Sequence, residues 1–216
     1  MSALIIPKLT IAHSMSMFNK IEQLSKNGLC LNINQVNWPN DFPKTIPVSV
    51  HIAHDNKKLY LYYQIEGEEL RVVNTKDFMS VWEDSCVEFF MQRKGERTYR
   101  NFEFNAHGVL LASKRESKEN AEQLSDELMA IIERFITIQN IYIKGEQLSN
   151  WTLYAEIPKE ALGFDEEEDL SKQAMAANFY KCGDETIEPH FLSWNPIDTP
   201  SPNFHVPEFF GALVFD

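Results

Sequence analysis

The residues with the clearest chemistry lie in one stretch, VWEDSCVEFFMQRKGERTYRNFEFNAHG, which covers residues 81–108. Apolar and polar residues alternate in it, and this alternation predicts a β-hairpin with one apolar and one polar face. The polar face collects carboxylates and amides, and it sets Glu88 roughly across from Asn101 or Glu103. These groups, next to Trp82, suit a polyhydroxylated ligand. The stretch predicts either a ligand-binding face or the solvated outer face of a sandwich.

The two carboxylates of this hairpin allow a catalytic interpretation as well. Neighbouring strands lie about 5 Å apart, which overlaps the carboxyl separation of retaining glycosidases. Glu88 and Glu103 would then be the catalytic pair of a glycoside hydrolase. Paired carboxylates on a sheet are common and most are not catalytic, so binding is preferred and no catalytic residue is assigned. A third class, in which the same face holds a peptide or a protein, stays open.

The composition excludes several kinds of partner. The net charge is −12 and the sequence pI is about 5.0, without a basic stripe, so no nucleic acid is expected as a partner. No apolar run reaches the ~20 residues that a bilayer requires, so no membrane span is expected. The 3 cysteines lack a CxxC pair and fit a reducing compartment. No leader is visible at the N-terminus, and the cytoplasm is the expected location.

One loop carries candidate ligands for a cation. Asp184, Glu185, Glu188 and His190 cluster there, ahead of His205 in the chain. Oxygen ligands of this kind suit calcium. Their spacing fits no specific loop motif, so an ordinary polar loop is the preferred interpretation. The expectation is no metal and no cofactor, with calcium as the single candidate.

Short alternating segments separated by turn residues dominate the rest of the chain. Residues 48–53 and 58–66 are typical of paired strands, and residues 14–25 have the apolar spacing of a short helix. A second apolar stripe at helical spacing predicts an inserted helix over about 118–135. Many short strands and little helix indicate an all-β fold, an antiparallel β-sandwich of two sheets. The length suits a single domain over residues 1–216.

Two segments, taken together, resemble a known family. The first is VWEDSCVEFFMQ followed by NFEFNAHG, and the second is ANFYKCGDETIEPHFLSWNPI followed by PNFH and the ending PEFFGALVF. Their order and spacing resemble the carbohydrate-binding family 9-like domains, close to the modules attached to some xylanases. The resemblance covers residues 48–215. It implies a β-sandwich that binds a mono- or disaccharide, with a role in carbohydrate catabolism.

The resemblance also implies a set of site residues. In that family two tryptophans sandwich the terminal sugar, and charged and amide side chains bond its hydroxyls. Trp82 resembles the first tryptophan and Trp194 the second. Asp84 resembles the acid that precedes the next strand, and Glu88 resembles the acid on that strand. The implied carbohydrate-binding residues are Trp82, Asp84, Glu88, Arg100, Asn101 and Trp194.

Residues 182–202 are expected to form one wall of this site. Several prolines restrict the backbone of this loop, and a stiff loop presents an aromatic ring at low entropic cost. Trp194 lies in this loop and is the expected second platform. Trp38 and Trp151 have neighbours typical of structural tryptophans.

Overall fold

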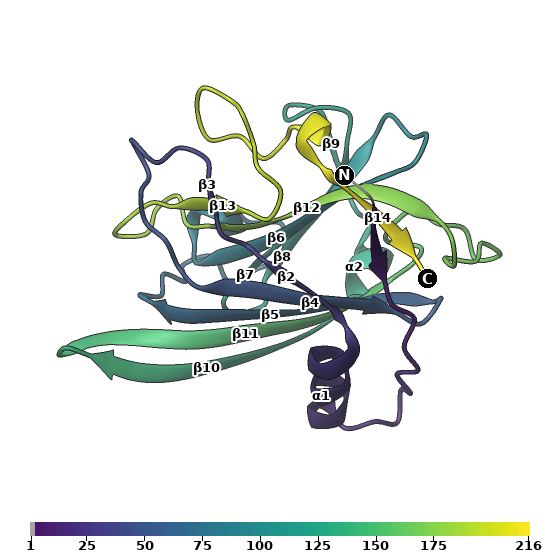
Figure 1. Cartoon of the computed structure of the whole chain (residues 1–216), viewed down its shortest axis with the longest axis horizontal. Coiled ribbons are helices and arrows are strands. Elements are labelled where there is room, and N and C mark those ends of the chain that lie inside the picture. The colour runs from purple at the N-terminus through teal and green to yellow at the C-terminus, as the bar shows by residue number, and fades with distance from the viewer. Residues whose placement is uncertain (1–2) are drawn as a thin grey trace.

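Two β-sheets pack against each other in the computed structural model, which describes residues 3–216 (Figure 1). The nine-stranded sheet has the order β1 (Leu4–Ile6), β14 (Gly211–Phe215), β12 (Ala174–Cys182), β6 (Cys86–Arg93), β7 (Tyr99–Asn105), β8 (Leu110–Arg115) and β9 (Ala121–Gln123). Strand β13 (Phe191–Ser193) pairs with β12 and with β3 (Gln35–Val36). The five-stranded sheet has the order β10 (Glu133–Ile143), β11 (Glu146–Pro158), β5 (Lys58–Glu68), β4 (Val48–His54) and β2 (Leu29–Asn32).

These strands pair antiparallel, apart from the parallel pair of β1 and β14 at one edge. The expected antiparallel sandwich of two sheets is therefore confirmed. The helical elements are α1 (Met17–Asn27), α2 (Asp126–Ala130) and the 3-10 turns η1 (Val81–Glu83) and η2 (Pro207–Phe209). None of the helices in the described part of the chain is long and apolar enough to cross a membrane.

The main core lies between the two sheets. Side chains alternate between the faces of a strand, so every second residue of β6 and β7 points into the sandwich. The inward set is apolar and fully buried, as the alternation predicted: Val87, Phe89, Met91, Phe102 and Phe104. The facing strand β5 contributes Leu59, Leu61, Tyr63 and Ile65.

Helix α1 covers the outer face of the five-stranded sheet (Figure 1). It begins where the Ser16 side chain accepts a backbone N–H of the first turn. Its apolar stripe was predicted, and Leu24 is fully buried against the tyrosines of that sheet. Lys20 is buried beside Leu24 and pairs with Glu156 of β11 at 2.6 Å, which compensates the charge of a buried carboxylate.

The outer face of the nine-stranded sheet is also covered, by loops from the C-terminal part of the chain (Figure 1). The Tyr180 ring on β12 stacks on Phe204 of these loops, with centroids 4.0 Å apart. Under this cover Glu88 and Glu103 are each only 3% exposed. The polar face of β6 and β7 is therefore buried, and its interpretation as a solvated outer face is wrong.

The helix expected over residues 118–135 is present only as a short helix, so its predicted bounds are wrong. The segment holds strand β9, the five-residue helix α2, and the start of β10 at Glu133. Its apolar residues divide between environments, because Leu124 and Met129 pack on the main core while Ile131 and Phe135 are exposed. Strand β10 pairs with β11 along its whole length, and this ladder outweighs the local helical spacing.

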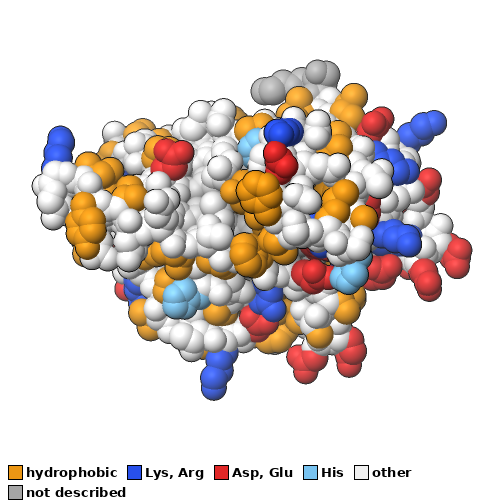
Figure 2. All heavy atoms as spheres, turned by 90° about the horizontal axis from the view of Figure 1, so that it is seen from below, with side chains coloured by type: hydrophobic (Ala, Val, Ile, Leu, Met, Phe, Trp, Pro, Cys, Tyr) orange, Lys and Arg blue, Asp and Glu red, His pale blue; other side chains and the backbone are white. Residues whose placement is uncertain are grey.

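Strands β10 and β11 form a long hairpin at the edge of the five-stranded sheet. Seen from below, hydrophobic groups are spread over this side of the molecule, including the end where the hairpin projects (Figure 2). Exposed apolar side chains of β10 are Phe135, Ile138, Tyr142 and Ile143. These side chains are exposed because β10 is an edge strand and its two faces are only partly covered.

Candidate functional site

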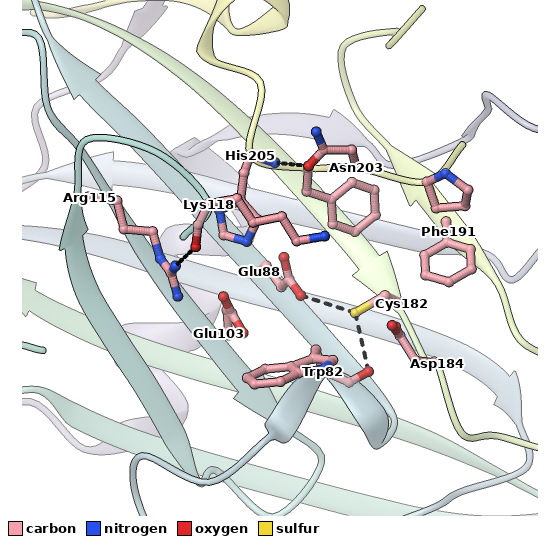
Figure 3. A pocket seen from close by; sticks show the side chains of 12 residues that line it. Trp82, Glu88, Glu103, Arg115, Lys118, Cys182, Asp184, Phe191, Asn203 and His205 are labelled. Atoms are coloured by element: carbon pink, nitrogen blue, oxygen red, sulfur yellow. Dashed lines mark hydrogen bonds between the residues drawn. The ribbon is translucent and has the colours of Figure 1, made fainter. Parts of the chain in front are cut away.

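A cavity of about 280 Å³ lies on the outer face of the nine-stranded sheet, beneath the covering loops (Figure 3). Glu88 of β6 and Glu103 of β7 form its floor. Trp82 of η1 and His205 lie on opposite sides of these two carboxyl groups (Figure 3). The other lining residues are Arg115, Lys118, Cys182, Asp184, Phe191, Pro202, Asn203 and Phe204.

Strand register brings the floor residues together. Glu88 lies directly across from Glu103 in the β6–β7 ladder, one of the two pairings that the sequence predicted. On the other side of β6, Cys182 of β12 lies directly across from Cys86. Residues two apart on a strand share a face. Cys86, Glu88, Glu103 and Cys182 therefore all lie on the face beneath the cavity.

Hydrogen bonds fix these side chains but leave one acceptor unused. Asn101 donates to Glu103 Oε1 at 2.7 Å and accepts from Arg115 Nε at 2.9 Å. The Cys182 thiol donates to Glu88 Oε1 at 3.1 Å. Within residues 3–216, Glu103 Oε2 is buried and has no hydrogen-bond partner. A buried carboxyl oxygen is costly to leave unbonded, so this oxygen calls for a donor from a ligand.

Burial raises the pKa of both floor carboxyls. The pKa of Glu103 rises to about 7 because its carboxyl is desolvated. The pKa of Glu88 rises well above its usual range, first through desolvation and then through the neighbouring Cys182 and Glu103. At neutral pH Glu88 is therefore protonated and able to donate a hydrogen bond to a ligand, while Glu103 is partly ionised.

The walls of the cavity carry their own perturbed groups. Burial, with Glu185 and Glu83 nearby, raises the pKa of Asp184 to about 6. Burial and the cations Arg115 and Lys118 lower the pKa of His205 to about 3, so its ring is neutral at pH 7. Its Nδ1 lies 2.9 Å from the Tyr99 hydroxyl, so only the other ring nitrogen is left for a ligand. The cavity thus offers donors and acceptors around an aromatic ring, which suits a ligand with several hydroxyl groups.

Glu103→Gln should flatten the pH dependence of stability between about pH 4.5 and 7. The unfolded chain ionises this group near 4.5, whereas the folded protein keeps it protonated up to about 7. Its contribution to stability is complete below pH 4.5 and is lost as the pH rises to 7, a change of about 3 kcal/mol. Urea unfolding at a series of pH values measures this change in the free energy of unfolding, and Glu122→Gln at an exposed position is the control. A constant difference between wild type and Glu103→Gln over this range would contradict the assignment.

The structure separates the six site residues that the resemblance implied. Trp82 and Glu88 line the cavity. Asp84 does not, because its fully buried carboxylate accepts the backbone N–H groups of Val73 and Asn74 and pairs with Arg71. These bonds hold residues 71–74 next to the end of η1, the turn that carries Trp82.

Arg100 and Asn101 occupy opposite faces of β7. Arg100 lies across from Met91 in the ladder, so it points to the inner side of the sheet, where it pairs with Glu96 at 3.1 Å. It does not reach the cavity. Asn101 lies on the cavity side of the sheet but does not line the cavity. Its side chain forms hydrogen bonds with Glu103 and Arg115, which do line it.

Trp194, the expected second platform, does not line the cavity. Its ring meets the core residue Phe179 edge-on at 5.8 Å, and it lies so close to Gly211 that a Cβ there would come within 2.5 Å. The loop of residues 182–202 still contributes to the wall, through Asp184, Phe191 and Pro202. The aromatic rings opposite Trp82 thus belong to Phe191, Phe204 and His205.

Sequence reasoning missed several lining residues that carried a signal. Cys182 ends the alternating segment that forms β12 and lies on the same face as Tyr180. Phe204 and His205 lie in the PNFH segment that forms part of the family resemblance. Arg115 is at the end of β8, and only the pairing of β7 with β8 shows that it reaches Asn101.

The candidate cation loop does not bring its side chains to one point. Asp184 lines the cavity, whereas Glu188 pairs with Lys44 at 3.0 Å. His190 is fully buried and lies 2.8 Å from the ammonium of Lys181. Glu188 and His190 thus take separate partners, and Asp184 faces the cavity.

Comparisons with known proteins extend these observations. The family model described as carbohydrate-binding family 9 matches residues 18–215. A crystal structure from Bacteroides uniformis ATCC 8492, provisionally described as a carbohydrate-binding protein, is 34% identical, with a TM-score of 0.88 over 99% of both chains. No curated protein matches the chain.

Two more distant structures share the fold. Both are family 9 carbohydrate-binding modules from Caldicellulosiruptor kristjanssonii. The glucose complex is 10% identical, with a TM-score of 0.58 over 100% of this chain and 96% of that one. The cellotriose complex is 9% identical, with a TM-score of 0.59 over 100% and 94%. Given the family match over most of its length and the 34% identical relative, the chain belongs to carbohydrate-binding family 9.

Proposed function

We propose that this protein binds a mono- or disaccharide unit in the cavity between Trp82 and the loop that carries His205. The unbonded Glu103 Oε2 is the observation that carries the proposal, since it is a buried acceptor in a cavity that the half-buried Trp82 also lines. The indole of Trp82 offers a surface on which the C–H face of a pyranose can stack. Glu103 accepts from a sugar hydroxyl, and protonated Glu88 and neutral His205 donate and accept beside it.

The size of the cavity and the ligands of the related structures support the same ligand class. A cavity of about 280 Å³ lies at the small end of the range for small-molecule sites, and this favours one or two sugar rings over a long chain. The two Caldicellulosiruptor structures hold glucose and cellotriose. We therefore take glucose and its β-linked oligomers as the first ligands to test, with a role in carbohydrate catabolism.

Trp82→Ala should weaken sugar binding by roughly 5- to 150-fold. Loss of the ring removes a stacking surface worth about 1–3 kcal/mol. Isothermal titration with glucose, xylose, cellobiose and glucuronate measures the affinity and identifies the sugar. Trp194→Phe is the matched control, because its ring packs outside the cavity and should leave binding unchanged. No binding at millimolar sugar, or full binding in Trp82→Ala, would remove the proposal.

Hydrolysis of a glycoside is the second candidate, and the carboxyl pair is the observation that favours it. Glu88 and Glu103 face each other across adjacent strands, and their pKa values differ in the direction that an acid and a nucleophile require. A steady rate on aryl glycosides that vanishes in Glu88→Gln would place hydrolysis above binding. Saturable binding without turnover would reject it.

A further inference from the structure

Three metal-binding atoms converge beneath the cavity floor. The Sγ atoms of Cys86 and Cys182 and a carboxylate oxygen of Glu88 all lie within 4.8 Å of one another. Glu88 Oε1 is 3.1 Å from Cys182 Sγ and 4.0 Å from Cys86 Sγ. The register of β6 and β12 fixes this arrangement, since Cys182 pairs with Cys86 and Glu88 is two residues further on the same face.

These separations match one face of a tetrahedral coordination sphere. Zinc binds thiolate sulfur at about 2.3 Å and carboxylate oxygen at about 2.0–2.2 Å, so neighbouring donors of one ion lie roughly 3.5–3.8 Å apart. The two measured distances from Glu88 Oε1 bracket this value. Small side-chain rotations would therefore place all three donors on one ion, without movement of the strands.

The position of the cluster gives an ion both access and an open ligand position. Cys182 and Glu88 line the cavity, whereas Cys86 is fully buried beneath them. The three protein ligands thus come from the sheet, and the fourth direction faces the cavity. Three protein ligands with one open position are typical of zinc sites that bind water or a substrate group.

The donor chemistry selects the class of ion. Two thiolates with one carboxylate favour Zn²⁺ and similar thiophilic ions over calcium or magnesium, which prefer oxygen alone. Two thiolates and a carboxylate carry more negative charge than one divalent ion neutralises. Arg115 and Lys118, which line the same cavity, supply nearby positive charge.

We propose that Cys86, Glu88 and Cys182 bind a thiophilic divalent metal ion such as Zn²⁺ at the floor of the cavity, with the fourth position open to a water or a ligand hydroxyl. The site does not depend on sugar binding. Without a metal, burial raises the pKa of both thiols and of the Glu88 carboxyl and keeps all three protonated, so loading must release a proton from each of the three ligands.

Titration of the reduced, oxygen-free protein with Cd²⁺, in the absence of sugar, tests this proposal. We expect one equivalent to bind per chain with a thiolate-to-metal charge-transfer absorption in the ultraviolet. The exposed third cysteine provides the matched control, so Cys30→Ser should keep the band at full intensity. Cys86→Ser and Cys182→Ser should each lose it, and Glu88→Gln should weaken binding at least tenfold.

A band that survives in both Cys86→Ser and Cys182→Ser, one that disappears in Cys30→Ser, or no band in the wild type would overturn the site. If a serine variant fails to fold, alkylation of the wild type decides. Cd²⁺ should then slow the reaction of Cys86 and Cys182 with a thiol reagent but not that of Cys30, as mass spectrometry of peptides would show. Equal rates with and without Cd²⁺ at all three cysteines would count against the proposal.

Discussion

Lys181→Met should lower the free energy of unfolding by about 3–5 kcal/mol, the cost of leaving one member of a buried ion pair without its partner. Lys181 is fully buried, and its ammonium lies 2.8 Å from Glu68 Oε1 and 2.8 Å from His190 Nε2. Glu68 is itself only 1% exposed. Without Lys181, its carboxylate would be charged, buried and unneutralised.

The position of this pair in the fold adds to the expected loss. Lys181 points inward from β12, while Glu68 is at the end of β5 in the opposite sheet. The indole N–H of Trp151 on β11 donates to the other Glu68 oxygen at 2.7 Å. The network therefore joins the two sheets through a single carboxylate.

Urea unfolding of the single and double variants tests this account. The double variant Lys181→Met with Glu68→Gln should recover most of the lost stability, because the amide removes the buried charge and still accepts from Trp151. The exposed Lys94→Met is the control and should stay within about 0.5 kcal/mol of wild type. A double variant as unstable as Lys181→Met alone would show that packing, and not charge, sets the effect.

Asp84→Ala should also cost about 3–5 kcal/mol, through loss of a buried charge-assisted hydrogen-bond network. The carboxylate accepts from the backbone of Val73 at 3.0 Å and Asn74 at 3.0 Å, and from the Asn105 amide at 2.9 Å. It also pairs with Arg71. Its removal leaves the N–H of the buried Asn74 without this acceptor and the Arg71 guanidinium without its ionic partner.

The same network positions η1, so the variant has a second expected effect. Asp84 follows directly after η1, which carries Trp82. Sugar affinity should therefore fall in Asp84→Ala even under conditions where the protein stays folded. Denaturant unfolding and sugar titration measure the two effects, with the neighbouring half-buried Glu83→Ala as control. Wild-type stability in Asp84→Ala would refute the structural role, whatever the sugar affinity.

The sequence by itself determined the β-hairpin at the centre of the site. Strict alternation separates Val87 and Phe89 from Glu88, and a one-residue shift would place a carboxylate in the main core. Local pattern and burial thus agree on which face Glu88 occupies, whereas the strand pairing in the structure decides that Glu88 lies across from Glu103 and not from Asn101. The apolar stripe of α1 was predictable for the same reason, because one periodicity serves one buried face.

Only the tertiary structure decided what surrounds that hairpin. The spacing around residues 118–135 fits a helix, but pairing of β10 with β11 gives more backbone hydrogen bonds than an isolated turn of helix can. The role of Trp194 depends on which side of β13 its ring packs, and the contact with Gly211 settles that.

The set of residues that line the cavity was also decided only by the tertiary structure. Its floor lies on β6, β7 and β12, and its cover on loops far along the chain, so Trp82, Arg115 and His205 meet only after the sheets have formed. A local pattern reports the face on which a side chain lies. Which distant residue covers that face depends on strand order and loop packing, and these are set by long-range contacts that no short segment encodes.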